Sequence, residues 1–98
     1  MFVSISRYRV KPGMEEALKA HNEEWKDTIR FRTLGFISVH VFKNPKDRAE
    51  WTSVAMFVDQ YSEMANANSP DHKQWYRGML DMLEGPPVYW QGELVQEG

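Results

Sequence analysis

The sequence contains no cysteine. This absence excludes a disulfide scaffold, a thiolate zinc site and a cysteine nucleophile. No apolar run approaches the roughly 20 residues of a membrane-spanning helix, and the first residues lack the apolar stretch of a signal peptide. We therefore expect a disulfide-free, cytoplasmic protein that does not bind membranes.

The chain also lacks a large excess of charge of either sign. It has 12 Lys and Arg residues against 14 Asp and Glu residues, which gives a formal net charge of −2. Such a balance provides no general attraction to nucleic acid, so no nucleic-acid partner is expected. Motifs of the Gly-rich phosphate loop, G-x-S-x-G and H-E-x-x-H types are missing. The three histidines are far apart in the sequence and lie on different predicted elements, so we predict neither a metal nor another cofactor.

The composition indicates one folded domain that spans residues 1–98. Hydrophobic residues make up 42% of the chain and charged residues 27%, which is typical of a globular protein rather than a disordered one. A length of 98 residues is too short for two separate cores. We find no internal repeat, linker or low-complexity segment.

The hydrophobic pattern predicts an α+β, ferredoxin-like fold. Residues alternate as in a strand over 2–10, 36–42, 51–58 and 88–95. Helical spacing runs over 14–29, a short helix is expected from Asp59 to Ala65, and Ser69-Pro70 opens a last helix that reaches Leu83. The order β-α-β-β-α-β predicts a four-stranded antiparallel sheet with its helices on one face.

Alternation divides the predicted sheet into two unlike faces, and neither has the polar character of a solvated surface. The first face carries aromatic residues around serines and one histidine: Phe2, Ser4, Ser6, Tyr8, Phe36, Ser38, His40, Phe42, Trp51, Ser53, Ala55 and Phe57. The second face is mainly aliphatic: Val3, Ile5, Arg7, Ile37, Val39, Val41, Thr52, Val54, Met56 and Val58.

The two faces predict two different neighbours. An exposed aliphatic face would form a patch larger than monomers usually tolerate, so we expect a homodimer with two sheets face to face. The alternative is a terminus or loop that folds over this face. Beneath the helices, small polar residues between large aromatic ones predict a cavity for a small molecule. The alternative is that Trp25, Trp75 and the methionines fill this space.

Several segments together resemble the antibiotic biosynthesis monooxygenase superfamily of dimeric α/β barrels. The segments that carry the resemblance are Arg9-Val10-Lys11-Pro12-Gly13, Leu34-Gly35-Phe36, Asn44-Pro45, Asn68-Ser69-Pro70-Asp71-His72 and Pro86-Pro87. The resemblance covers nearly the whole chain and rests on the order and spacing of these pieces. It implies a homodimer with a site between sheet and helices in each subunit. It also implies oxygenation of phenolic or polycyclic aromatic substrates by dioxygen, without metal or flavin.

One branch of this superfamily degrades haem and uses an Asn on the first strand, a Trp before the last helix and a His within it. With Gly13 and Ser69 as reference points, this chain has Ser6, Asn66 and Tyr76 at those places. None of the three matches, so haem binding or haem degradation is the less favoured interpretation.

Cofactor-free oxygenation requires a base and hydrogen-bond donors for the substrate oxyanion. The candidate catalytic residues are His40, in the middle of a strand on the serine-rich face, and His72, in the first turn of the last helix. The helix dipole there would keep His72 neutral, as a base or a donor. His21 lies on the apolar stripe of the first helix and is interpreted as a packing residue. The candidate substrate-binding residues are Ser6, Ser38, Trp51, Ser53, Asn66, Trp75 and Tyr76.

The function expected from the sequence is therefore a cofactor-independent monooxygenase, an oxidoreductase that acts on a small aromatic, quinol or polyketide-like substrate. The alternative is a dimeric protein of the same fold that binds a small hydrophobic molecule and does not catalyse a reaction.

Overall fold

The computed structural model describes all residues, Met1–Gly98. Its strands are β1 (Phe2–Arg9), β2 (Phe36–Lys43), β3 (Glu50–Phe57) and β4 (Val88–Glu93). Its helices are α1 (Glu15–Thr28), the 3₁₀ turn η1 (Arg30–Arg32), α2 (Gln60–Ala67) and α3 (Pro70–Leu80).

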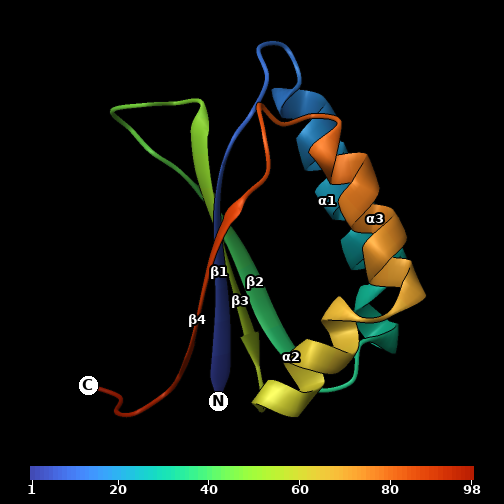
Figure 1. Cartoon of the computed structure of the whole chain (residues 1–98), viewed down its shortest axis with the longest axis vertical. Helices are drawn as coiled ribbons and strands as arrows, with labels where there is room; N and C mark the ends of the chain where they lie inside the picture. The colour runs from blue at the N-terminus through green and yellow to red at the C-terminus, as the bar shows by residue number, and fades with distance from the viewer.

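The four strands form one antiparallel sheet in the order β2-β3-β1-β4. Helices α1 and α3 lie along one face of the sheet, α2 closes one end, and the opposite face has no cover (Figure 1). The predicted α+β, ferredoxin-like fold is therefore confirmed. None of the helices combines the length and apolar character that a membrane crossing requires.

Caps explain where α2 and α3 begin. The Asp59 side chain accepts a hydrogen bond from the backbone N–H of Ser62, and the Ser69 side chain accepts one from that of His72. Pro70 follows Ser69 at the first position of α3, where a missing N–H costs nothing. Separate caps at Asp59 and Ser69 thus start two distinct helices, α2 and α3.

Helix α3 ends at Leu80, earlier than its apolar spacing predicts. The next residues instead form hydrogen bonds with the end of the first strand: Lys11 N–H donates to the Met82 carbonyl, and Glu84 N–H donates to the Arg9 carbonyl. Leu83 therefore reaches the core from an extended bridge opposite Val10. The apolar stripe continues because Leu83 stays buried, although the helix has ended.

Strand β2 contains an irregularity that changes which face its residues occupy. Phe36 pairs with Phe57, but Ser38 pairs with Met56, so Ile37 is an extra residue without a partner. After this bulge Val39 lies opposite Ala55 and points to the same face, beneath the helices.

The alternation predicted for β1 and β3 holds, but the prediction for β2 beyond the bulge is wrong. Val39 and Val41, which pair with Ala55 and Ser53, face the helices. Ser38, His40 and Phe42, which pair with residues of the opposite parity, face outward.

The space between sheet and helices is filled at its two ends. At one end a cluster of six buried residues joins β1, β3, α1, α3 and the Val10–Leu83 bridge: Tyr8, Val10, Leu18, Trp51, Met79 and Leu83. At the other end the rings of Trp25 and Phe36 are 5.0 Å apart, and those of Phe36 and Phe57 are 5.7 Å apart. Only 11 of the 98 residues are buried. Between the two packed ends, side chains of the sheet and of the helices line an open space.

Two reciprocal hydrogen bonds between His21 and Trp75 connect α1 and α3. Nε2 of His21 lies 2.7 Å from the Trp75 carbonyl, which can only accept, so the imidazole donates. In return, the indole N–H of Trp75 donates to the His21 carbonyl at 3.0 Å, and the two rings stack with centroids 5.1 Å apart. His21 is thus a packing residue, in agreement with its interpretation from the sequence.

Candidate functional site

A cavity of about 450 Å³ lies between the sheet and the helices. This volume is within the usual range for sites that bind small molecules. The sheet contributes Ser4, Ser6, Phe36, Val39, Val41, Ser53, Ala55, Phe57, Tyr89 and Gln91. The helices contribute Asn22, Trp25, Glu63, Asn66, Ala67, His72, Lys73, Trp75, Tyr76 and Met79.

Small side chains on two adjacent strands produce the hollow. Ser6 pairs directly with Ser53, and Ser4 pairs with Ala55, so the middle of the sheet presents no large side chain to the helices. The Tyr8 hydroxyl and Ser53 Oγ form a hydrogen bond of 2.7 Å. This bond ties the floor of the cavity to the buried cluster at one end.

His72 enters the cavity from the first turn of α3. Its ring stacks on Tyr76, with centroids 6.2 Å apart, and lies 5.8 Å from the ring of Trp75. Burial lowers the pKa of His72 below its usual value, because an imidazolium would lose its hydration. The side chain is therefore neutral at pH 7.

The surroundings of His72 also indicate which nitrogen carries the proton. Nδ1 is enclosed and has no hydrogen-bond partner. An enclosed N–H without an acceptor is rarer in proteins than an unpaired acceptor. The tautomer with its proton on Nε2 is therefore favoured, and His72 can offer an N–H to a ligand.

Glu63 is the one buried charged residue of the chain, with 7% of its surface exposed. The side-chain amide of Gln91 donates a hydrogen bond of 2.9 Å to its Oε1. Burial raises the pKa of the Glu63 carboxyl, and the bond from Gln91 offsets part of this effect. Glu63 takes part in none of the seven ion pairs of the structure.

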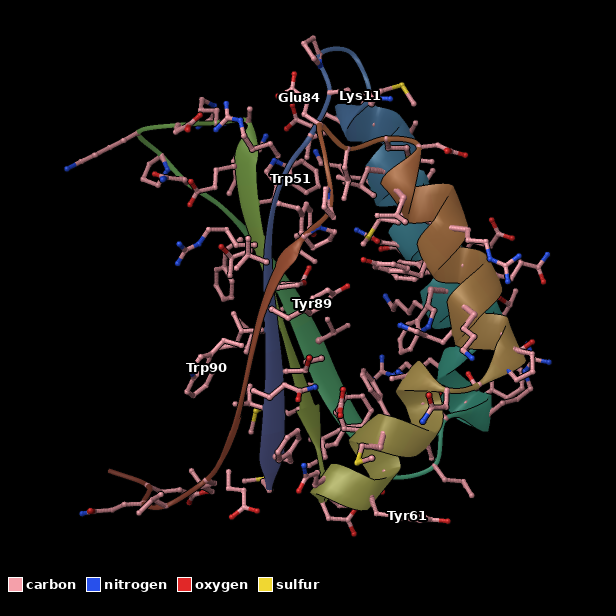
Figure 2. All side chains as sticks on the ribbon, viewed as in Figure 1. Lys11, Trp51, Tyr61, Glu84, Tyr89 and Trp90 are labelled. Atoms are coloured by element: carbon pink, nitrogen blue, oxygen red, sulfur yellow. The ribbon has the colours of Figure 1, made fainter.

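Two tyrosines add hydroxyl groups to the cavity, Tyr76 from α3 and Tyr89 from β4. Tyr89 of β4 points toward the helices in Figure 2, and its ring lies 6.3 Å from that of Tyr76. Burial and the neighbouring Tyr76 hydroxyl raise the pKa of Tyr89 well above its usual value. The Tyr89 hydroxyl therefore keeps its proton at neutral pH and can donate a hydrogen bond.

The structure brings most of the predicted site residues to this one cavity. Those that line it are Ser6, Ser53, Asn66, His72, Trp75 and Tyr76. Ser38 and His40 do not, because the bulge in β2 turns them to the outer face, where His40 is exposed. Trp51 faces the helices but is only 3% exposed, within the buried cluster at one end. The predicted placement of these three residues in the cavity is wrong.

Sequence reasoning missed Glu63, Gln91 and Tyr89. For Tyr89 and Gln91 a signal existed, because alternation places both on the same face of β4. For Glu63 the signal was its spacing, since Asn66 and Ala67 lie three and four residues further along α2 and share its face. No three or more His, Asp or Glu side chains come together in the arrangement that a metal ion requires.

Comparisons with known proteins agree with this architecture. Residues 1–78 match the family model described as Antibiotic biosynthesis monooxygenase. No curated protein sequence matches the chain. A variant of SnoaB, a cofactor-independent oxygenase from Streptomyces nogalater, has a similar structure with a TM-score of 0.83 and 10% identity, over 98% of this chain and 94% of that chain.

Two further solved structures show the same likeness. A candidate antibiotic biosynthesis monooxygenase from Bordetella bronchiseptica gives a TM-score of 0.83 and 19% identity, over 97% of both chains. A protein from Mycobacterium tuberculosis gives a TM-score of 0.81 and 16% identity, over 98% of this chain and 96% of that chain. At these identities the structures establish the shared fold, whereas the sequence match covers most of the domain. The chain belongs to the antibiotic biosynthesis monooxygenase family.

Proposed function

We propose that this protein is a cofactor-independent monooxygenase that acts on a small aromatic, quinol or polyketide-like substrate. One observation carries the proposal: a mainly apolar cavity of about 450 Å³ holds a neutral histidine and a protonated tyrosine beside aromatic walls. Trp75 and Tyr76 can stack on a flat ring, and the serines of the sheet can orient its oxygen atoms.

In such a reaction the substrate itself supplies the electrons. Deprotonation gives an anion that can reduce dioxygen, so the protein must hold the anion and keep water away from it. Nε2 of His72 and the Tyr89 hydroxyl are the donors that we assign to the developing oxyanion. For anthrone, the balanced reaction consumes one dioxygen and yields anthraquinone and one water.

Oxygen consumption by the purified protein, after treatment with a chelator and without added flavin, tests this function. We expect uptake with anthrone or hydroquinone, and a fall of at least about tenfold in His72→Gln, because the loss of one hydrogen-bonding group from a reaction site commonly costs this much. His40→Gln is the matched control, because His40 is an exposed histidine that does not line the cavity.

The result also separates an enzyme from a binding protein. Aromatic ligands that bind in the cavity while no substrate consumes oxygen would favour a non-catalytic carrier of a hydrophobic molecule. An equal loss of uptake in both histidine variants would contradict the role given to His72.

We further propose that two copies pair through the outer face of the sheet. Phe42, Val88 and Trp90 are 57%, 72% and 60% exposed there. Val3, Ile5, Val54 and Met56 lie on the same face, as their cross-strand partners show. An apolar surface of this kind is typical of a protein interface, and the face-to-face packing of two sheets would cover it.

A further inference from the structure

We propose that Glu63 is the proton acceptor of the cavity: its carboxylate receives the proton of an acidic hydroxyl or methylene group on a flat aromatic ligand. The inference rests on the function proposed above and deepens it, because it names the residue that would generate the substrate anion. It also defines the ligand class, since only an aromatic ligand with an acidic hydrogen beside Glu63 can give its proton to this carboxylate.

The placement of Glu63 on its helix is the reverse of the usual pattern. Tyr61 and Met64 are 81% and 52% exposed, whereas Glu63 between them is 7% exposed. The figure supports this arrangement, with Tyr61 on the outer side of α2 (Figure 2). Helix α2 therefore directs its acidic side chain into the molecule and its large apolar side chains away from it.

One oxygen of the carboxyl group is free to bind a ligand. Gln91 holds Oε1, and no cation lies within ion-pairing distance of Glu63. A buried carboxylate without a cation is costly unless hydrogen bonds stabilise it. Oε2 has no protein donor, so a ligand hydrogen at this position would complete the arrangement.

The other titratable groups of the cavity do not suit this role. They are His72, Lys73 and Tyr76 of α3 and Tyr89 of β4; α1, β1, β2 and β3 contribute none. A second proton on His72 would leave an enclosed Nδ1–H without an acceptor. A lysine ammonium offers only hydrogen-bond donors, and a tyrosine hydroxyl offers a donor. Glu63 is the remaining group that can accept a proton there.

In the proposed reaction, the Glu63 carboxylate takes up one proton from the substrate and later returns it. A methylene C–H of anthrone gives its proton to Oε2, and the electron pair stays on the substrate. The anion passes one electron to dioxygen, and the resulting radical and superoxide combine into a peroxide anion. Glu63 returns its proton to the peroxide, and the hydroperoxide then loses water with the second methylene hydrogen, which leaves the carbonyl.

The first test is binding without turnover. We measure 2-naphthol and its ether 2-methoxynaphthalene by titration calorimetry at pH 7 under nitrogen. We expect the wild-type protein to prefer the naphthol by at least about tenfold, because a hydrogen bond to a charged acceptor is among the stronger ones. In Glu63→Gln the preference should fall to about threefold or less, since a neutral acceptor bonds more weakly.

Glu24→Gln is the matched control, because Glu24 is exposed on α1 and lies outside the cavity. Its preference should equal that of the wild type. A wild-type protein that binds both ligands equally, or a Glu63→Gln variant that keeps the full preference, would overturn the assignment.

The second test is oxygen uptake with anthrone between pH 5 and 9. The rate should rise with pH as the Glu63 carboxyl ionises, and Glu63→Gln should lose at least about tenfold in kcat together with this rise. Unchanged uptake in Glu63→Gln, with uptake intact in the wild type, contradicts the inference alone. A naphthol preference that depends on Glu63 without any oxygen uptake supports the proton-accepting site and contradicts the monooxygenase function.

Discussion

At the scale of single residues, burial shifts the pKa of the cavity's histidine and the pKa values of its glutamate and tyrosine in opposite directions. Loss of hydration disfavours a charge of either sign, so it lowers the pKa of His72 and raises the pKa of Glu63 and of Tyr89. The histidine and the tyrosine thus become neutral donors at pH 7. The carboxyl group becomes a stronger base than an exposed glutamate, which suits proton abstraction from a weak carbon or phenol acid.

The lowered pKa of His72 predicts a pH-dependent stability. As pH falls below about 6.5, the unfolded chain takes up a proton that the folded protein resists, so the wild type loses stability. Well above pH 6.5, His72 is neutral in both the folded and the unfolded protein, so it makes no pH-dependent contribution to the free energy of unfolding. His72→Gln cannot titrate, so its melting temperature should fall less than that of the wild type between pH 8 and pH 5.

Each unit of pKa difference corresponds to about 1.4 kcal/mol, and 1 kcal/mol shifts the melting temperature of a domain of this size by about 4–8 °C. A shift of this size is measurable, so thermal unfolding curves of the wild type and of His72→Gln at several pH values are sufficient for the comparison. Parallel changes in the two melting temperatures over this range would contradict the burial of His72 as a neutral group.

Some of these residues could be predicted and others could not. Ser6 and Ser53 follow from uninterrupted alternation on two central strands, and His72 follows from the Ser-Pro start of its helix. Glu63 was missed because a charged residue on a short helix is normally assigned to the solvated face. Its spacing from Asn66 and Ala67 places Glu63 on their face of α2, but which face of α2 is buried depends on how the helix is oriented over the end of the sheet, which is a tertiary effect.

At the scale of elements, strand β2 shows where alternation fails. Ile37, Val39 and Val41 are as apolar as Phe36 and Phe42, so both parities fit a buried face, and the pattern alone cannot locate an extra residue. The bulge at Ile37 exchanges the two sets. His40 leaves the predicted site for this reason, and two valines become part of the cavity wall.

Gly35, in the turn before β2, provides a test of how closely this turn packs against α2. Gly35 has φ of +77°, and a Cβ there would lie 2.1 Å from Ser62 Oγ on α2. Gly13 has φ of +80°, but a Cβ there would meet no atom within 4 Å. Both alanine variants incur the left-handed strain of about 1–2 kcal/mol, and Gly35→Ala adds a steric cost of about 1–3 kcal/mol.

Urea unfolding of the two variants measures this difference, and Gly35→Ala should be the less stable protein. Removal of the Ser62 side chain in Gly35→Ala/Ser62→Gly should recover part of the steric cost, since the nearest atoms are those of Ser62. Equal midpoints for the two single variants would show that α2 is not packed against the turn.

At the scale of the whole molecule, the sheet has a cavity under one face and an uncovered apolar surface on the other. The same four strands therefore serve two purposes, and residues alternate between them along β1, β3 and β4. Tyr89 points into the cavity, whereas its neighbour Trp90 points away from the helices (Figure 2). An interface on the outer face would support the floor of the cavity from behind without blocking access to it.

Trp90 gives the sharpest test of pairing through this outer face. It is 60% exposed in the single chain, so Trp90→Glu should leave the fold of one subunit intact while it places a carboxylate inside the proposed interface. An unpaired charge buried there would cost several kcal/mol, and each 1.4 kcal/mol weakens the pairing about tenfold. Sedimentation velocity should then show a dimer for the wild type and a folded monomer for the variant.

Tyr61→Glu is the matched control, because Tyr61 is an aromatic residue that is 81% exposed on α2, away from the outer face. It should sediment as the wild type does. Circular dichroism of each variant checks that the subunit has stayed folded, so that dissociation is not confused with unfolding. A monomeric wild type, or a Trp90→Glu variant that stays dimeric, would mean that another segment or surface mediates any association of this chain.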